Sequence, residues 1–368
     1  MKKLKIFSFF SGSGFLDLGF ETNGFDIEFV NEFSPAFINA YKYSRQKMGL
    51  RLPKYGYCNT DVNEYLEERA EELRLDIADA RKDGSLIGFI GGPPCPDFSV
   101  AGKQRGRNGN NGKLSLSYVR LIIAQMPDFF LFENVKGLWQ TAKHREYYEE
   151  LKAMLSDVGY CMTDRLTNAI EFGAPQDRDR ILLFGISKKL FPQGERLISA
   201  FPWNKYICYS LENIKKIQWP ITNKFVENSE RECPHNIPKE LTVQYWFDKN
   251  DVEHHPNGND CFTPHSGIAK MLTVDEGDDS KKSYKRLHRW RYSPTVAYGN
   301  NEVHLHPYKA RRLTVAEALA LQSLPKEFAL PPEMSLTDKF KTTGNGVPFL
   351  LACGIAKTIA DFLNEEVQ

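Results

Sequence analysis

The chain opens with a strand, a glycine-rich turn and a helix in direct succession, and this unit constrains the fold most. An apolar run over residues 5–10 leads into Ser11-Gly12-Ser13-Gly14, and a helix-like stretch continues to Glu21. Glycines at such a turn let a ligand approach the backbone closely. Further apolar strands are expected over 25–30, 85–90, 128–132 and 181–186, with helices over 34–43 and 116–126. This alternation predicts an α/β fold with a doubly wound, mostly parallel sheet.

The composition and periodicity of the sequence change after residue 187. Residues 188–310 are rich in Pro, Asn, Tyr, Trp and His and have weak periodicity. Order returns with Thr314 and Glu317, which form a capping box, and with an apolar helical face over 346–363. We therefore predict a large α/β domain over 1–187, a smaller irregular domain over 188–310, and a C-terminal return over 311–368 that completes the first domain.

Composition limits the class of protein without naming a partner. The 368 residues carry a net charge of +1, which gives no support to a nucleic-acid partner but leaves room for a local basic face. Seven cysteines with no CxxC pair predict reduced thiols in a cytoplasm. No apolar run is long enough for a membrane span, and we expect a monomer that uses no membrane.

Three polar groups follow predicted strands, where ligands of α/β sheets bind, and a fourth group precedes one. Glu32 ends the second strand and is placed to hold ribose hydroxyls, a pattern that fits NAD, FAD or S-adenosylmethionine. Cys95 lies in the rigid loop GGPPCPDFS, and Glu133 ends the apolar strand FFLFE, where partial desolvation would suit a proton donor. Gln176–Arg180 precedes a further strand. Taken singly, a tight turn, a buried thiol and a surface salt bridge explain these residues equally well.

These motifs, in this order, resemble those of the cytosine-5 DNA methyltransferase family. The glycine turn resembles the family's cofactor loop, and Pro94-Cys95 with Phe98-Ser99 resembles its catalytic loop. The other matches are Glu133-Asn134-Val135 to ENV, Gln176-x-Arg178-x-Arg180 to QxRxR, Gly344-Asn345-x-Val347 to GNxV, and Arg312-Leu313-Thr314 with Leu321-Gln322 to the segment before GNxV. Phe15 stands where the family usually has glycine, and Pro96 where it has glutamine, so we expect altered packing beside the cofactor and an altered catalytic loop.

The resemblance implies a Rossmann-like S-adenosylmethionine-dependent methyltransferase fold with a target-recognition domain at 188–310. The implied activity is that of a DNA (cytosine-5-)-methyltransferase, which methylates carbon 5 of a flipped-out cytosine in double-stranded DNA. Cys95 would be the nucleophile, its pKa lowered by Arg178. Glu133 would hydrogen-bond ring nitrogen 3, and Arg180 would donate to the exocyclic oxygen. The cofactor-binding positions carried over are Phe10, Ser11, Gly12, Ser13, Gly14, Glu32, Phe33, Asp61, Pro94, Leu114, Asn345 and Val347.

DNA contacts are expected from two basic segments. The glycine-rich loop after Cys95 would close over DNA through Ser99, Lys103, Arg105 and Arg107. The basic, aromatic stretch 281–291 would read bases or bind phosphates through Lys285, Arg286, Arg289 and Arg291. Cys233, His235, His254, His255, Cys261 and His265 match no zinc spacing, so no metal is expected.

Other readings of the same residues remain open. A transfer-RNA methyltransferase would share the chemistry, a catalytically dead DNA-binding module would share the fold, and a nicotinamide or flavin oxidoreductase would share the glycine turn. The intact Cys95, Glu133, Arg178 and Arg180 favour an active enzyme. The resemblance further implies a cytoplasmic, nucleoid-associated enzyme of a restriction–modification system, with a cognate endonuclease acting on the same site.

Overall fold

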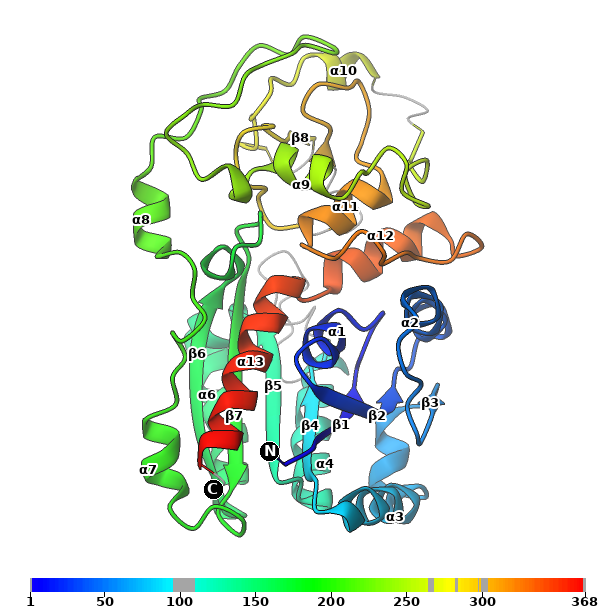
Figure 1. Cartoon of the computed structure of the whole chain (residues 1–368), viewed down its shortest axis with the longest axis vertical. Helices are drawn as coiled ribbons and strands as arrows, with labels where there is room; N and C mark the ends of the chain where they lie inside the picture. The colour runs from blue at the N-terminus through cyan, green and yellow to red at the C-terminus, as the bar shows by residue number, and fades with distance from the viewer. Residues whose placement is uncertain are drawn as a thin grey trace.

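The chain forms a seven-stranded sheet with helices on both faces, and a group of short elements lies above the sheet in the view of Figure 1. The computed structural model describes residues 2–94, 110–263, 268–281, 284–296, 298 and 304–366, without the side chains of 110, 111 and 366. The strands are β1 Leu4–Phe9, β2 Phe25–Asn31, β3 Tyr57–Cys58, β4 Leu86–Gly91, β5 Phe129–Val135, β6 Tyr160–Asn168, β7 Asp179–Ser187, β8 Lys285–Arg286 and β9 His304–Leu305. The α-helices are α1 Phe15–Glu21, α2 Pro35–Met48, α3 Ala70–Ala80, α4 Asn110–Gln125, α5 Gly137–Gln140, α6 Ala142–Asp157, α7 Gly194–Ser199, α8 Leu211–Lys216, α9 Val243–Lys249, α10 Ile268–Leu272, α11 Val315–Leu321, α12 Leu336–Asn345 and α13 Phe349–Glu366.

The strand order β3-β2-β1-β4-β5-β7-β6 confirms the predicted doubly wound α/β fold. Strands β1, β2, β4 and β5 are parallel neighbours, so their carboxyl ends meet at one edge of the sheet. Strand β7 runs antiparallel between β5 and β6. The reversal brings the amino end of β7, rather than its carboxyl end, to the edge where β1, β4 and β5 finish.

Apolar layers cover both faces of the sheet. Helices α1 and α13 pack on one face, where Phe20, Leu351 and Ile355 are buried. Helices α3, α4 and α6 pack on the other, with Leu73 and Leu121 buried. Because both faces are covered, the central strands are apolar at nearly every position, as the sequence of β5 illustrates.

The elements from α8 to β9 form the upper group in Figure 1. Their core joins Trp246 of α9 and Leu287 to Leu321 of α11. Phe191 and Ile198, in contrast, pack with the core of the sheet although they follow residue 187. The domain limits at 187 and 310 stay a prediction, and the packing favours a start of the irregular domain after α7.

The C-terminal segment contains a helix break that the sequence did not predict. The capping box of Thr314 and Glu317 is present at the start of α11. The expected helix over 346–363 is observed as α13, which starts at Phe349, while α12 ends at Asn345. Pro348 lacks a backbone N–H and clashes with a preceding helical turn, so α12 cannot run on into α13. No single described helix is long and apolar enough to span a membrane. Among the described residues, only α12 and α13 taken together reach the length and apolar composition of a membrane span, and a bend of 41° separates them.

Phe15, one of the two residues that depart from the family pattern, packs against Gly346; the other, Pro96, lies outside the described residues. A Cβ added at Gly346 would overlap the Phe15 ring, which also meets Phe328 edge-on at 5.1 Å between ring centroids. Phe15 is 2% exposed. In the structure the bulk of Phe15 is matched by the lack of a side chain at Gly346. The expected effect of Phe15 on packing beside the cofactor stays a prediction.

We predict that Gly346→Ala lowers the free energy of unfolding by about 1–3 kcal/mol, because the methyl group overpacks against Phe15. Phe15→Ala should be destabilising alone, yet the double variant should lose clearly less than the sum of the two. Urea unfolding measures these values. Phe20→Ala, on the same helix but packed edge-on against Phe25, is the control and should add to Gly346→Ala without coupling. Full additivity of the Phe15 pair would contradict the proposed fit.

Candidate active site

The glycine turn after β1 is held by its own backbone and by β2. Phe10 has a φ of 53°, a conformation that costs energy for a residue with a side chain and is often found at functional sites. The Ser11 N–H donates to the Asn31 carbonyl at 3.2 Å, and the Gly14 N–H donates to the Ser11 carbonyl at 2.9 Å. A Cβ added at Gly12 would meet no atom within 4 Å. The turn therefore offers open space over its backbone at Gly12.

Glu32 lies directly against this turn. Its Oε2 accepts the Gly12 N–H at 2.8 Å, and its Oε1 accepts the Ser34 N–H at 2.8 Å. Burial raises the pKa of Glu32, while these two N–H groups oppose the shift. The next residue, Phe33, is 72% exposed, although an aromatic ring is usually covered. A carboxylate and an open aromatic surface thus stand side by side at the end of β2.

The segment around Asp61 is tied to the same place by two asparagines that the sequence analysis missed. Asn59 donates from Nδ2 to the carbonyls of Glu32 and Phe33, both at 2.8 Å. Asn31 donates to the Thr60 carbonyl at 3.0 Å. Asp61 caps a short 3-10 helix, its Oδ1 accepting the Asn63 N–H at 2.9 Å. The stretch CNTDV gives a weak signal for this role, since Asn and Asp favour such caps.

The GNxV segment reaches the glycine turn from the other side. Ser13 Oγ and Thr342 Oγ1 lie 2.7 Å apart in a hydrogen bond. Asn345 is exposed at the end of α12, whereas Val347 is buried in the core of the sheet. Pro94 is exposed at the end of β4, and Leu114 of α4 is partly buried. Val347 therefore supports the site from the core and offers little surface to a ligand.

Glu133 and Arg180 form a buried ion pair at the edge where β5 and β7 meet. Arg180 pairs with Val135 in the antiparallel register, so Arg180 and Glu133 stand on the same face, diagonally across the two strands. Arg180 Nε lies 2.5 Å from Glu133 Oε1, and the two side chains are 8% and 10% exposed. Burial raises the pKa of Glu133, and the Arg180 and Arg178 charges oppose that shift. Gly92 packs against the other carboxylate oxygen, where a Cβ would overlap it.

Arg178 points to the backbone of two distant segments. It donates to the Val296 carbonyl and to the Gly344 carbonyl, each at 2.7 Å. Burial and the neighbouring Arg180 lower the pKa of Arg178 well below its usual range. Gln176 adds a second tie, because its Oε1 accepts the Val296 N–H at 2.9 Å and its Nε2 donates to the Leu321 carbonyl at 3.0 Å. The QxRxR segment thus joins the sheet, the irregular domain and the C-terminal return.

Five predicted residues lie outside the described residues. They are the expected nucleophile and four expected DNA contacts, namely Cys95, Ser99, Lys103, Arg105 and Arg107. The described chain resumes at α4, so the ends of this segment follow β4 and precede α4.

Two of the basic residues expected to bind DNA are buried instead. Arg286 is 0% exposed and donates to the carbonyls of Val274 at 2.7 Å and Met271 at 2.6 Å. Arg289 is 3% exposed and pairs with Glu276 at 2.8 Å. Both cations hold loops of the irregular domain together, so their prediction as DNA contacts disagrees with this structure. The sequence pattern of basic residues interleaved with aromatic ones did not distinguish a surface stripe from buried structural cations.

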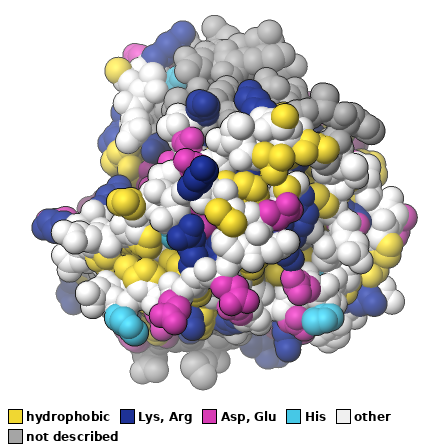
Figure 2. All heavy atoms as spheres, turned by 90° about the horizontal axis from the view of Figure 1, so that it is seen from above, with side chains coloured by type: hydrophobic (Ala, Val, Ile, Leu, Met, Phe, Trp, Pro, Cys, Tyr) yellow, Lys and Arg dark blue, Asp and Glu magenta, His cyan; other side chains and the backbone are white. Residues whose placement is uncertain are grey.

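Lys285 and Arg291 are only partly buried, so their prediction stays open. Figure 2 shows basic side chains interspersed with acidic and hydrophobic ones on the face seen from above. The described residues on that face therefore present mixed charge, in keeping with the net charge of +1.

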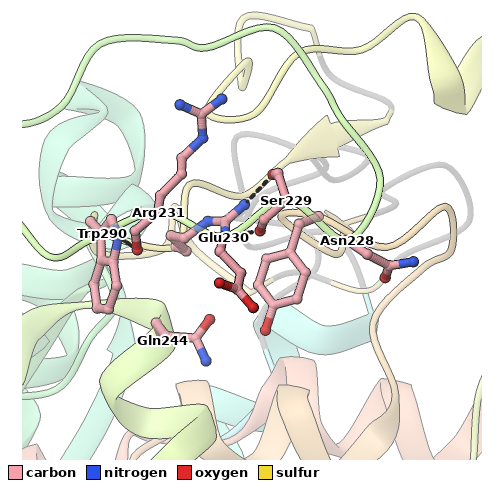
Figure 3. Close-up of a pocket in the computed structure, with 8 residues that line it drawn as sticks. Asn228, Ser229, Glu230, Arg231, Gln244 and Trp290 are labelled. Carbon is pink, nitrogen blue, oxygen red and sulfur yellow. Dashed lines mark hydrogen bonds between the residues drawn. The ribbon is translucent and has the colours of Figure 1, made fainter.

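A shallow hollow of about 390 Å³ opens in the irregular domain (Figure 3). It is lined by Asn228, Ser229, Glu230, Arg231, Gln244, Arg289, Trp290 and Tyr308. Arg289 donates to Ser229 Oγ at 2.9 Å, and the Arg231 guanidinium points away from the hollow in Figure 3. Most of the lining residues have polar or charged side chains, and two aromatic residues, Trp290 and Tyr308, complete the lining. Of these residues the sequence analysis singled out only Arg289 and, as part of the stretch 281–291, Trp290.

Comparison with known proteins points to one family. Residues 4–361 match the family described as C-5 cytosine-specific DNA methylase. The Type II methyltransferase M.NmeDI of Neisseria meningitidis serogroup C is 55% identical over 368 residues, which are 100% of this chain and 86% of that protein. M.XorII of Xanthomonas oryzae pv. oryzae is 36% identical, with coverage of 98% and 85%. M.FnuDI of Fusobacterium nucleatum is 30% identical, with coverage of 99% and 96%.

Solved structures agree on the fold. A candidate DNA modification methyltransferase encoded within an E. coli prophage superposes with a TM-score of 0.68 at 24% identity, covering 98% of this chain and 100% of that one. The S. pombe Dnmt2 methyltransferase superposes with a TM-score of 0.60 at 13% identity, covering 99% of each chain. At these identities the likeness speaks for the fold.

We predict that Arg180→Met lowers the free energy of unfolding by about 3–5 kcal/mol at neutral pH, because it leaves the Glu133 carboxylate buried without its partner. The loss should shrink as the pH falls, since the unpaired carboxyl then takes up a proton. Combining Arg180→Met with Glu133→Gln should recover part of the stability. Urea unfolding at several pH values measures this.

Arg74→Met is the matched control, because Arg74 pairs with Glu71 at 2.6 Å on the exposed surface of α3. Its stability should be unchanged. An Arg180→Met protein as stable as the parent at neutral pH would show that the buried pair contributes nothing.

Proposed function

The chain belongs to the C-5 cytosine-specific DNA methylase family, and from this we propose that it moves a methyl group from S-adenosylmethionine to carbon 5 of a cytosine turned out of duplex DNA, through a covalent adduct with Cys95. It is a DNA cytosine-5 methyltransferase of the Type II restriction–modification kind. The observation that carries the proposal is the meeting of the glycine turn, Pro94, Glu133 and Arg180 at one sheet edge. A cofactor and a base bound at that edge would be neighbours.

The residues at the ends of β1 and β2 fit an adenosyl cofactor. The open backbone at Gly12 admits close approach, and the Glu32 carboxylate retains lone pairs for ribose hydroxyls. Phe33 and Phe10 offer rings for the adenine, Asp61 would meet its amino group, and Asn345 would lie beside the methionine part. When bound, S-adenosylmethionine supplies an electrophilic sulfonium methyl.

The chemistry on the base is assigned to three side chains. The Cys95 thiolate adds to carbon 6, and the electron pair released onto carbon 5 takes the methyl group. Glu133 hydrogen-bonds ring nitrogen 3 and offsets the charge that develops there, which suits a carboxyl whose burial raises its pKa. Arg180 holds the exocyclic oxygen and keeps the base in plane. A base, for which water is a candidate, then takes the proton from carbon 5. The electron pair of that C–H bond forms the double bond between carbons 5 and 6 as the sulfur leaves carbon 6 as a thiolate, which restores the aromatic ring.

The DNA must deform for this chemistry, because a stacked cytosine cannot reach the sheet edge. Extrusion of the base costs a few kcal/mol, which phosphate contacts offset. We assign those contacts to Ser99, Lys103, Arg105 and Arg107, with Lys285 and Arg291 from the irregular domain as the remaining candidates there. This domain would read the sequence, and an endonuclease with the same site would be the partner in the cell.

Cys95→Ser should abolish methyl transfer to duplex DNA while leaving the affinity for S-adenosylhomocysteine nearly intact, because the thiol does not hold the cofactor. DNA containing 5-fluorocytosine should trap a covalent adduct with the parent enzyme and none with Cys95→Ser, since fluorine cannot leave as a proton does. Cys208→Ser, at an exposed cysteine, is the control and should behave as the parent. Normal turnover by Cys95→Ser would disprove the assignment.

Glu133→Gln should lower the turnover rate by about 10²–10⁴, the usual contribution of a positioned proton donor. Single-turnover rates on DNA measure this step, with Glu149→Gln on the exposed side of α6 as the control. A rate within threefold of the parent would remove Glu133 from the mechanism.

Bisulfite sequencing of DNA from cells expressing the chain tests the activity as a whole. Methylation of cytosines within one sequence context is expected. Transfer to transfer RNA in vitro, with none to duplex DNA, would overturn the proposed substrate.

A further inference from the structure

A buried group of charged side chains packs against the glycine turn at Gly14. Arg45 of α2 is 0% exposed, and its Nη2 donates to the Gly14 carbonyl at 2.6 Å. Its Nε lies 2.6 Å from Glu21 Oε2 at the end of α1. Its guanidinium carbon stands 4.2 Å from the centre of the Tyr41 ring. Arg45 thus contacts both ends of α1 and also the ring of Tyr41, which belongs to α2 as Arg45 does.

The rest of the group balances this cation. Tyr41 donates to Asp17 Oδ2 at 3.0 Å, and Asp17 is 1% exposed. Burial raises the pKa of Glu21 to about 7, and the Arg45 charge opposes that rise. Burial of a long cationic side chain is costly and needs partners. Such a cost is hard to account for on stability alone, because apolar residues of the same volume serve a core as well or better.

The position of Gly14 explains why the contact with Arg45 matters for the glycine turn. Gly14 caps α1 in the left-handed region, with φ 79° and ψ 30°. A Cβ there would overlap the Tyr41 ring and come within 2.7 Å of Arg45 Nη2. The turn is therefore pinned at two points by consecutive parts of one segment: Glu32, just before α2, holds Gly12, and Arg45, within α2, holds Gly14.

We infer that Arg45 is a positioning residue for the cofactor, which fixes the glycine turn relative to Glu32 by holding the Gly14 carbonyl and tying α2 to both ends of α1. The inference rests on the proposed function, because it takes the turn and Glu32 as the cofactor site. Arg45 touches neither base nor cofactor, so its removal should weaken cofactor binding and leave the chemical step alone.

The test compares Arg45→Met with Arg45→Lys and the parent. Calorimetry with S-adenosylhomocysteine should show at least a tenfold rise in Kd for Arg45→Met, matched by the KM for S-adenosylmethionine, while kcat at saturating cofactor stays within twofold. Arg45→Lys keeps the charge near Gly14 and Glu21 and should recover part of the affinity. Arg286→Met removes an equally buried arginine from the irregular domain, and its Kd for S-adenosylhomocysteine should be unchanged.

Arg45→Met leaves two buried carboxyl groups without their cation, so Arg45→Met/Glu21→Gln carries the test if the single variant does not fold. A parent-like Kd in whichever variant folds would overturn the inference, as would a fall in kcat with an unchanged Kd. Failure of the parent itself to bind S-adenosylhomocysteine would overturn the proposed cofactor, and the inference with it.

Discussion

The ion pair between Glu133 and Arg180 is possible only because β7 runs against its neighbours. In a wholly parallel sheet the amino end of β7, which carries Arg180, would lie at the opposite edge from the end of β5. The reversal brings Arg180 beside Glu133 and puts Gln176 and Arg178 just beyond the sheet, where they reach Val296, Leu321 and Gly344. The irregular domain and the C-terminal return are attached to the sheet at this corner, so the placement of both depends on one antiparallel strand.

The part of the fold that could be predicted from the sequence follows from burial. Strands β1, β2, β4, β5 and β7 are covered on both faces, so their runs of apolar residues are unambiguous. Strand β6 is an edge strand of mixed polarity with a half-buried centre, and its sequence YCMTDRLTN gives no clear period. The direction of β7 was beyond prediction for another reason, because a run buried on both faces looks the same in either direction.

The candidate site divides in a similar way. Residues in contact with the glycine turn, such as Glu32, could be predicted, because Glu32 lies at the end of the predicted strand next to that turn. Residues that act through burial could not: Arg45 lies beyond the helix predicted over 34–43, and only the structure shows it within α2 and turned inward to Gly14. The same limit produced the error at Arg286 and Arg289. A run of basic residues predicted an exposed DNA-binding surface, but these two arginines are buried and hold loops of the irregular domain together.

The packing of α1 on α13 has a consequence for how the molecule is made. Gly19 of α1 lies directly on Ala352 and Cys353 of α13, so closely that a methyl group would not fit between them. Helix α1, which follows the glycine turn, can thus pack on α13 only after residues more than three hundred positions later in the chain have left the ribosome. Until then the side of α1 that packs on α13 lacks that cover, although Phe20 of α1 already has Phe25 of β2 to pack on. We therefore expect a truncated chain without α13 to fold incorrectly at α1 and the glycine turn before it, far in sequence from the point at which synthesis stopped.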